Sequence, residues 1–188
     1  IHRNDVISWV QAHPHAMWIP IALTFVSLIM MFCTANHYAA KVISFAVFLL
    51  SLTAVMAVSI LQYSPKIILM AGTGTVGICL VGALYAKSQA SKGVDLVSWG
   101  PVLAGALWCI LFASFVSWLI GATWTQTGIA AASLIVFTFY LIYDINQICI
   151  GKDANDPLMK DGMIASINVF LDILNLFLSL LQLLDSSE

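Results

Sequence analysis

The middle of the chain contains 48 consecutive residues without an acidic or basic side chain, Leu96–Tyr143, with the sequence LVSWGPVLAGALWCILFASFVSWLIGATWTQTGIAAASLIVFTFYLIY. A helix that crosses the hydrocarbon core of a bilayer needs about 20 predominantly apolar residues. The run is therefore long enough for two such helices, and the polar segment GATWTQTG at residues 121–128 is the natural break between them. We predict membrane spans at residues 98–120 and 128–150.

The rest of the sequence has the same character. Hydrophobic residues make up 61% of the 188 residues, charged residues make up only 9%, and the mean hydropathy is +0.99. Ordinary globular domains are about half apolar and about one quarter charged, so this chain lacks the side chains for a water-exposed surface. Uncharged stretches of similar length predict further spans at residues 15–35, 42–63, 67–86 and 162–184. The predicted fold class is all-α: a polytopic membrane helix bundle with six visible spans, forming one domain over residues 1–188.

The few charged residues bear on partners and on topology. The formal net charge is −2 and the seven Lys and Arg residues are scattered, which excludes the basic surface of a nucleic-acid-binding protein. If the spans alternate in direction, Arg3 and Lys66 lie on one side of the bilayer, and five lysines lie on the other side: Lys41, Lys87, Lys92, Lys152 and Lys160. The positive-inside rule assigns the lysine-rich side to the cytoplasm or an equivalent compartment. The expected partners are the lipid bilayer and, as an open alternative, other membrane protein subunits.

Motifs of soluble enzymes and metal proteins are missing or misplaced. The four cysteines lie in four different apolar segments without C-x-x-C spacing, so we expect them to pack as small hydrophobic residues. The segment GTGTVG at residues 72–77 matches the glycine pattern of a dinucleotide-binding turn, but it lies inside an apolar span with no strand before it. Its small residues and the glycine at 82 are better explained by close helix packing. We expect neither an enzyme activity nor a cofactor.

Two acidic residues, Asp144 and Asp172, lie inside predicted spans. An ionisable group within the bilayer costs several kcal/mol to insert, so it indicates a functional site. Asp144 is about seven residues from the end of its span and Asp172 about ten residues into the next, which places them at depths of roughly 10 and 15 Å at 1.5 Å per residue. Consecutive spans are expected to pack side by side, so the two carboxyl groups are in a position to meet.

Neutral polar residues predict which faces of these two helices turn inward. The last predicted span carries a polar stripe at helical spacing: Asn168, Asp172, Asn175, Ser179 and Gln182. Tyr140, Asp144 and Gln147 repeat this spacing in the preceding span. The sequence therefore predicts a polar seam between the two helices, in which the aspartates are supported by Asn168, Asn175, Gln147 and Tyr140.

Two carboxylates in a medium of low dielectric constant do not both ionise readily, so we expect the pair to share a proton. Without that proton, the pair offers hard oxygen ligands to a cation such as calcium, and nearby amide side chains add neutral oxygens. So few ligands predict weak and transient binding, as permeation and exchange require. Asp144 and Asp172 are therefore the candidate ion or proton gate and the candidate metal ligands, with calcium as the bound or transported ion.

A second interpretation of the aspartates stays open. Asp144 and Asp172 would then hydrogen-bond across the bundle to Asn, Tyr or backbone groups and hold the helices in register. No Lys or Arg lies inside a predicted span to pair with them. Under this interpretation the chain is a non-transporting structural subunit of a larger membrane complex, for example in the mitochondrial inner membrane.

The segments around the two aspartates carry a specific pattern: SINVFLDILNLF at residues 166–177 and YDINQICIG at residues 143–151. They resemble the A-L-N-x-Y-L-D-I-x-N-x-F and Y-D-T-Q-x-x-x-G segments of the transmembrane Bax-inhibitor-motif family, which includes Bax inhibitor and the lifeguard proteins. WVQAHP at residues 9–14 is similar to the lifeguard branch. Two positions differ from the family pattern: Ile145 replaces Thr, and Asn36-His37 stand where basic residues often follow the second span.

The resemblance implies a seven-helix protein, so a further span before Ile1 is expected. It also implies a pH-sensitive calcium leak channel or calcium/proton exchanger of an internal membrane, linked to suppression of cell death, with Asp144 and Asp172 as proton sensor and gate. The membrane would be that of the endoplasmic reticulum, the Golgi or the mitochondrial inner membrane. The two aspartates favour this hypothesis, whereas the missing basic residues favour the structural subunit.

Overall fold

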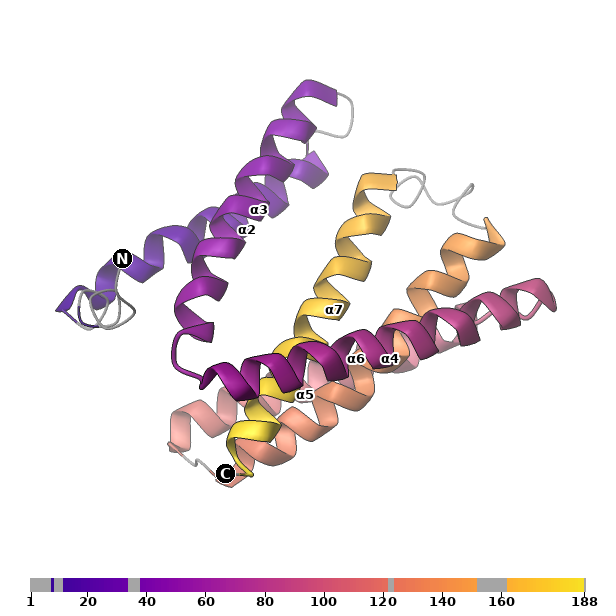
Figure 1. Cartoon of the computed structure of the whole chain (residues 1–188). Helices are drawn as coiled ribbons and strands as arrows, with labels where there is room; N and C mark the ends of the chain where they lie inside the picture. Colours follow the sequence, from indigo (N-terminus) through magenta and orange to yellow (C-terminus); the bar gives the residue numbers. More distant parts are fainter. Residues whose placement is uncertain (1–7, 9–11, 34–37, 122–123, 152–161, 188) are drawn as a thin grey trace. The chain divides into compact units, whose positions relative to one another are not determined.

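The computed structural model describes residues 8, 12–33, 38–121, 124–151 and 162–187, and within these residues every regular element is a helix (Figure 1). Two short 3₁₀ helices, η1 (Pro14–Met17) and η2 (Val97–Trp99), accompany six α-helices: α2 (Trp18–Cys33), α3 (Tyr38–Ile60), α4 (Pro65–Ser91), α5 (Gly100–Ile120), α6 (Trp124–Ile150) and α7 (Gly162–Asp185). Among the described residues, the segments 39–60, 65–91, 97–120, 125–150 and 164–185 are long and apolar enough to cross a membrane, and a shorter apolar helix covers residues 18–31. The predicted polytopic membrane helix bundle is confirmed.

Large apolar side chains cover the outer surfaces of these helices. Trp118 is 74% exposed and Leu50 is also 74% exposed, and many other leucines, valines and phenylalanines are similarly open. A contiguous apolar surface of this kind is characteristic of contact with another apolar medium. These side chains therefore face the acyl chains of a bilayer, which is the environment of the protein.

The chain forms two compact units, residues 1–64 and 65–188. The prediction of one domain over the whole chain stays a prediction. In the first unit, α2 packs against α3. The hydroxyl of Thr24 on α2 bonds the hydroxyl of Ser51 on α3 at 3.0 Å. Small hydroxyl residues allow helices to approach closely and satisfy one another's polar groups within a membrane. Residues 9–11 and 36–37, which entered the family resemblance, lie outside the described part of the chain.

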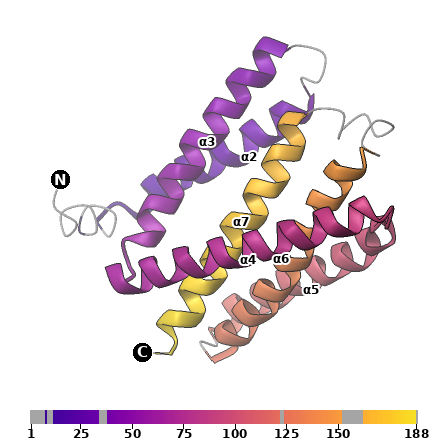
Figure 2. The same ribbon diagram turned by 45° about the vertical axis from the view of Figure 1, so that its right-hand side comes forward.

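Helix α6 is the centre of the second unit, because it contacts α4, α5 and α7 (Figure 1 and Figure 2). Helix α4 also contacts α7. The Asn146 side chain near the end of α6 bonds the Ala86 carbonyl near the end of α4, so these two helices end at the same side of the unit. A 2.6 Å bond between the hydroxyls of Ser117 and Thr125 joins the end of α5 to the start of α6. The alternating course expected of consecutive spans is therefore present in this unit.

The helix ends differ from the predicted spans at the polar segments. Helix α4 begins at Pro65 instead of residue 67 and continues to Ser91 instead of residue 86. Proline suits the first helical position because its missing N–H has no partner there in any case. The break expected over residues 121–128 is shorter: Gly121 takes a left-handed conformation with φ of 69°, and α6 already begins at Trp124. The following polar residues stay helical because the helix satisfies their backbone groups.

Two packing predictions are only partly correct. A Cβ atom would lie 3.2 Å from Leu180 at Gly74 and 3.5 Å from Ile142 at Gly82, which confirms close helix packing at these glycines, but it would meet nothing within 4 Å at Gly72 or Gly77. The four cysteines are free, and all but Cys79 are exposed. The expectation that they pack in the interior is therefore wrong for three of them. A lipid-facing position suits a small apolar side chain as well as an interior position does.

Candidate functional site

Asp144 on α6 and Asp172 on α7 meet inside the second unit. They are 7% and 6% exposed, and their side chains interact through a hydrogen bond as well as through charge. Two carboxyl groups this close in an apolar interior do not both ionise readily, so we expect the pair to share one proton. The second oxygen of Asp172, Oδ2, is buried and has no hydrogen-bond partner among the described residues. The two aspartates are thus brought together, while their role as a gate stays a prediction.

Another residue of α6 and a third helix, α4, also contribute to this site. Tyr140 lies one turn before Asp144 on α6, near enough for its ring hydroxyl to interact with the charges of both aspartates. Cys79 on α4 lies near enough to interact with Asp172. The sequence predicted a site between two helices, and the contribution of α4 was not predicted. An uncharged Cys in an apolar span carries no sequence signal that would have identified it.

Within the polar stripe of α7, Asp172 and Ser179 are buried, and Asn168, Asn175 and Gln182 are half-buried. Asn168 and Asn175 lie one turn before and one turn after Asp172, as the spacing predicts. Ser179 is 6% exposed, and its hydroxyl donates to the Asn175 carbonyl at 2.7 Å. The side chains of Asn168 and Asn175 therefore accompany the aspartate along one face of the helix.

The predicted ligand role of the Gln147 amide oxygen stays a prediction, while its amide nitrogen makes a contact that the sequence did not predict. Its nitrogen Nε2 donates to Oδ1 of Asp95 at 3.2 Å, in the loop between α4 and α5. The same Asp95 oxygen accepts the Val97 backbone N–H at 3.0 Å. Gln147 is 4% exposed, so this contact is part of the interior. The hydrogen bond from the Gln147 amide nitrogen to Asp95 links the loop to α6.

Asn146 is a site residue that the analysis of the spans missed, although it entered the family pattern. It is fully buried, its Oδ1 accepts the Leu96 N–H at 3.2 Å, and its Nδ2 donates to the carbonyls of Val94 at 3.1 Å and Ala86 at 3.5 Å. Buried polar groups need such partners, since an unpaired one costs about 1–3 kcal/mol. Asn146 therefore holds the loop against α6 two residues after Asp144. The sequence signal that could have identified Asn146 is an amide side chain within an apolar span.

Replacing Asn146 with Ala is expected to lower the free energy of unfolding by about 2–4 kcal/mol, because it leaves the Leu96 N–H and the Val94 carbonyl without the partner they have here. Gln147→Ala is the matched control. It removes one bond and leaves Asp95 bonded to the Val97 N–H, so its expected effect is about 1 kcal/mol. Unfolding of the purified variants in detergent measures both values. Equal losses of stability would contradict the assignment of the loop contact to Asn146.

The described residues contain no group of three or more His, Cys, Asp or Glu side chains that could hold a metal ion. The candidate site therefore offers two carboxylates to a cation. Calcium usually takes six to eight oxygen ligands, so the others would come from amide side chains, backbone carbonyls or water. A site with so few fixed charges fits a passing ion better than a permanently bound one.

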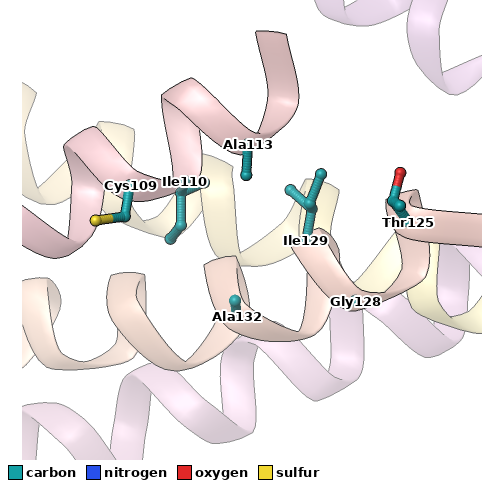
Figure 3. Close-up of a pocket in the computed structure, with 7 residues that line it drawn as sticks. All are labelled: Cys109, Ile110, Ala113, Thr125, Gly128, Ile129 and Ala132. Carbon is teal, nitrogen blue, oxygen red and sulfur yellow. The ribbon is translucent and has the colours of Figure 1, made fainter. Parts of the chain in front are cut away.

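Two cavities lie near other parts of α6. One of about 530 Å³ opens between α5 and α6 (Figure 3), where it is lined by Cys109, Ile110, Ala113, Thr125, Gly128, Ile129 and Ala132. It has no acidic or basic side chain, so it offers no acid–base chemistry. A smaller cavity of about 250 Å³ is lined by Ser114, Ser117, Trp118, Gln126, Ile129 and Gln182. Gln182 is the last residue of the polar stripe on α7, so the stripe leads from the aspartate to a polar cavity.

Comparison with known proteins gives a consistent result. The family described as inhibitor of apoptosis-promoting Bax1 matches residues 5–188. The chain is similar to the BI1-like protein of Arabidopsis thaliana, with 31% identity over 151 residues, 79% of this chain and 56% of that protein. It is 28% identical to Protein LIFEGUARD 2 of the same plant over 189 residues, 98% of this chain and 76% of that protein.

The Golgi anti-apoptotic protein of vaccinia virus is 33% identical over 94 residues, 50% of this chain and 38% of that protein. The chain thus spans little more than half the length of the BI1-like protein. No solved structure matches the chain.

Proposed function

Because the chain belongs to the Bax inhibitor family, which matches residues 5–188, we propose that it is a pH-sensitive calcium leak channel or calcium/proton exchanger of an internal membrane. The observation that carries the proposal is the contact between the buried carboxyl groups of Asp144 and Asp172. Acidic side chains at this depth cost several kcal/mol to place in a bilayer. A membrane bundle that needed only helix packing would use apolar or small polar residues there.

The pair acts as a site for either a proton or a divalent cation. With one proton, the two carboxyl groups bond each other and carry a single negative charge. Without it, two negative charges face each other, and a divalent cation relieves their repulsion. Calcium binding therefore displaces the proton, and the affinity for calcium rises as the pH rises. Low pH fills the pair with protons and excludes the cation.

The polar stripe of α7 is the proposed route to the pair. From Asp172 it follows Asn175 and Ser179 to Gln182 at the cavity of about 250 Å³. The ten residues from Asp172 to Gln182 correspond to roughly 15 Å along the helix. In the other direction, Asp144 lies about 10 Å from the end of α6 at Ile150. An ion at the pair thus lies between the two ends of the bundle.

The proposed biological role is suppression of cell death. The description of the family refers to inhibition of apoptosis, and the vaccinia relative carries an anti-apoptotic name. The name of that relative also places it in the Golgi, which supports an internal membrane. Control of the calcium content of an internal compartment is the chemistry through which the aspartate pair would serve this role.

Reconstitution of the full chain in liposomes that contain a calcium-sensitive dye tests the transport proposal. We expect calcium entry above that of protein-free liposomes, with a rate that falls as the pH on both sides is lowered, because protons occupy the pair. The same preparations kept at constant pH and varied calcium provide the control for dye response. An absence of protein-dependent calcium entry at every pH would overturn the proposal and favour a structural subunit.

A further inference from the structure

An apolar groove of about 520 Å³ lies on the outside of the second unit, between α4 and α6. Residues of α4, the α5 entry and α6 line it, including Gly77, Val81, Tyr85, Trp99, Phe139 and Ile142. Neither aspartate of the candidate gate lines it. Its volume lies within the range of about 300–1,000 Å³ that is usual for small-molecule sites.

Two glycines and two aromatic rings explain why the groove is open. A Cβ at Gly77 would meet nothing within 4 Å, so the absence of a side chain there leaves space on the helix surface. At Gly82, a Cβ would lie 3.5 Å from Ile142, so the two helices close together beside the open part. The Trp99 ring contacts the Phe139 ring edge-on, with centroids 5.6 Å apart, and forms one wall.

The position of the groove within a membrane span favours an acyl chain as its occupant. From Gly77 to Tyr85 the helix rises by roughly 12 Å, close to the depth of one leaflet in a hydrocarbon core of about 30 Å. Tyr85 and Trp99 line the groove together, and such rings are enriched where acyl chains meet the headgroups. The hydroxyl of Thr138, another lining residue, bonds the Leu134 carbonyl of its own helix at 2.7 Å. The wall of the groove is therefore apolar.

The charges beyond Tyr85 indicate which headgroup fits. Lys87 and Lys92 are both exposed at the end of α4. Lys92 lies in the turn that follows the end of the helix at Ser91, whereas Lys87, two residues after Tyr85, points to the other side of the helix. The acidic Asp95 nearby is bonded to the Gln147 amide and the Val97 N–H. Each basic residue near a membrane surface raises the affinity for anionic lipid by about fivefold.

We propose that this groove binds one acyl chain of an anionic phospholipid whose phosphate lies at Lys92. The site is independent of the proposed calcium pathway. It accounts for the glycine at position 77, which close helix packing does not explain because no neighbour approaches it.

Native mass spectrometry of the full chain tests the proposal, after equilibration with phosphatidylglycerol and phosphatidylcholine of identical acyl chains. We expect the wild type to retain one phosphatidylglycerol at least fivefold more often than phosphatidylcholine. Gly77→Leu fills the groove and is expected to remove this lipid. Gly128→Leu is the matched control: it also has no neighbour within 4 Å of a Cβ, and it fills the cavity of Figure 3 instead. It should retain the lipid. Lys92→Gln should bind both lipids equally.

Equal retention of the two lipids by the wild type would overturn the anionic headgroup assignment. Loss of lipid in Gly128→Leu but not in Gly77→Leu would overturn the location. If Gly77→Leu fails to yield a monodisperse protein, Val81→Trp fills the same groove from a residue that is 70% exposed. Retention of the lipid by a folded Val81→Trp variant would equally contradict the proposal.

Discussion

Replacing Asp172 with Asn is expected to lower calcium entry into liposomes at least tenfold and to remove its dependence on pH. The Asn side chain has a similar shape, but it carries no charge and releases no proton. The remaining Asp144 supplies one negative charge instead of two. At an effective dielectric constant of about 20, one unit charge at about 4 Å is worth roughly 4 kcal/mol, so the loss of one charge is ample for this effect.

Asp185→Asn is the matched control for this experiment. It makes the same substitution on the same helix, at an exposed residue where α7 ends. We expect it to leave both calcium entry and its pH dependence unchanged. Asp144→Asn is expected to match Asp172→Asn, and the double variant to be no worse than either, because the two carboxyl groups act as one unit. Calcium entry at the wild-type rate in the Asp172→Asn variant would contradict the transport proposal.

Replacing Asp144 and Asp172 together with Leu is expected to stabilise the protein while it abolishes calcium entry. The Oδ2 atom of Asp172 is buried without a hydrogen-bond partner among the described residues. A buried unsatisfied polar atom costs about 1–3 kcal/mol, and Leu of similar length removes it. For a chain of this size, each kcal/mol corresponds to about 2–4 °C, so the midpoint of thermal unfolding should rise by roughly 2–12 °C. Thermal unfolding in detergent at neutral pH measures the shift.

The sign of this shift separates the two interpretations of the aspartate pair. If Asp144 and Asp172 only hold the helices in register, the double Leu variant removes that contact and lowers the unfolding midpoint. If the pair serves transport at the expense of stability, replacing it with leucine raises the unfolding midpoint. Leu178→Ala, a half-buried position on the same helix, is the control for sensitivity and should lower the midpoint in either case. A lower midpoint for the double Leu variant would favour the structural subunit.

The helices and the proximity of the two aspartates could be predicted from the sequence alone. Long runs without charged residues indicate the helices, and isolated acidic residues within such runs indicate the aspartate pair. A charge-free run fixes the number of crossings, and the helical spacing of Asn168, Asp172 and Asn175 fixes the inward face of α7. The spans were less accurate at their ends. Polar residues after Trp124 and after residue 86 are helical, because hydropathy reports the edge of the apolar core and not the end of the helix.

The contacts of the α4–α5 loop were beyond sequence reasoning. Asn146 and Gln147 are adjacent to the aspartate motif, and periodicity assigned the Gln147 amide to the ion site. Their partners, Val94, Asp95 and Leu96, lie about 50 residues earlier in the chain, and only the packing of α4 against α6 brings them together. Long-range contacts of this kind leave no periodic signal in either segment.

Helix α6 combines three roles because it has three helical neighbours. Ile142 lines the groove shared with α4, Asp144 meets Asp172 of α7, and Asn146 holds the loop before α5. These residues are two apart, so successive side chains point about 200° away from each other around a helix of 3.6 residues per turn. Ile145, at the position where the family has Thr, packs against the apolar cluster of Ala86, Leu96 and Ile142.

Proton release on addition of calcium tests the central claim most directly. The purified full chain in weakly buffered detergent solution, slightly below neutral pH, is titrated with calcium while a pH indicator records the protons set free. A shared proton that calcium displaces predicts about one proton per chain for the wild type and none for Asp172→Asn. Calcium binding without proton release, or equal release from the wild type and Asp172→Asn, would contradict it.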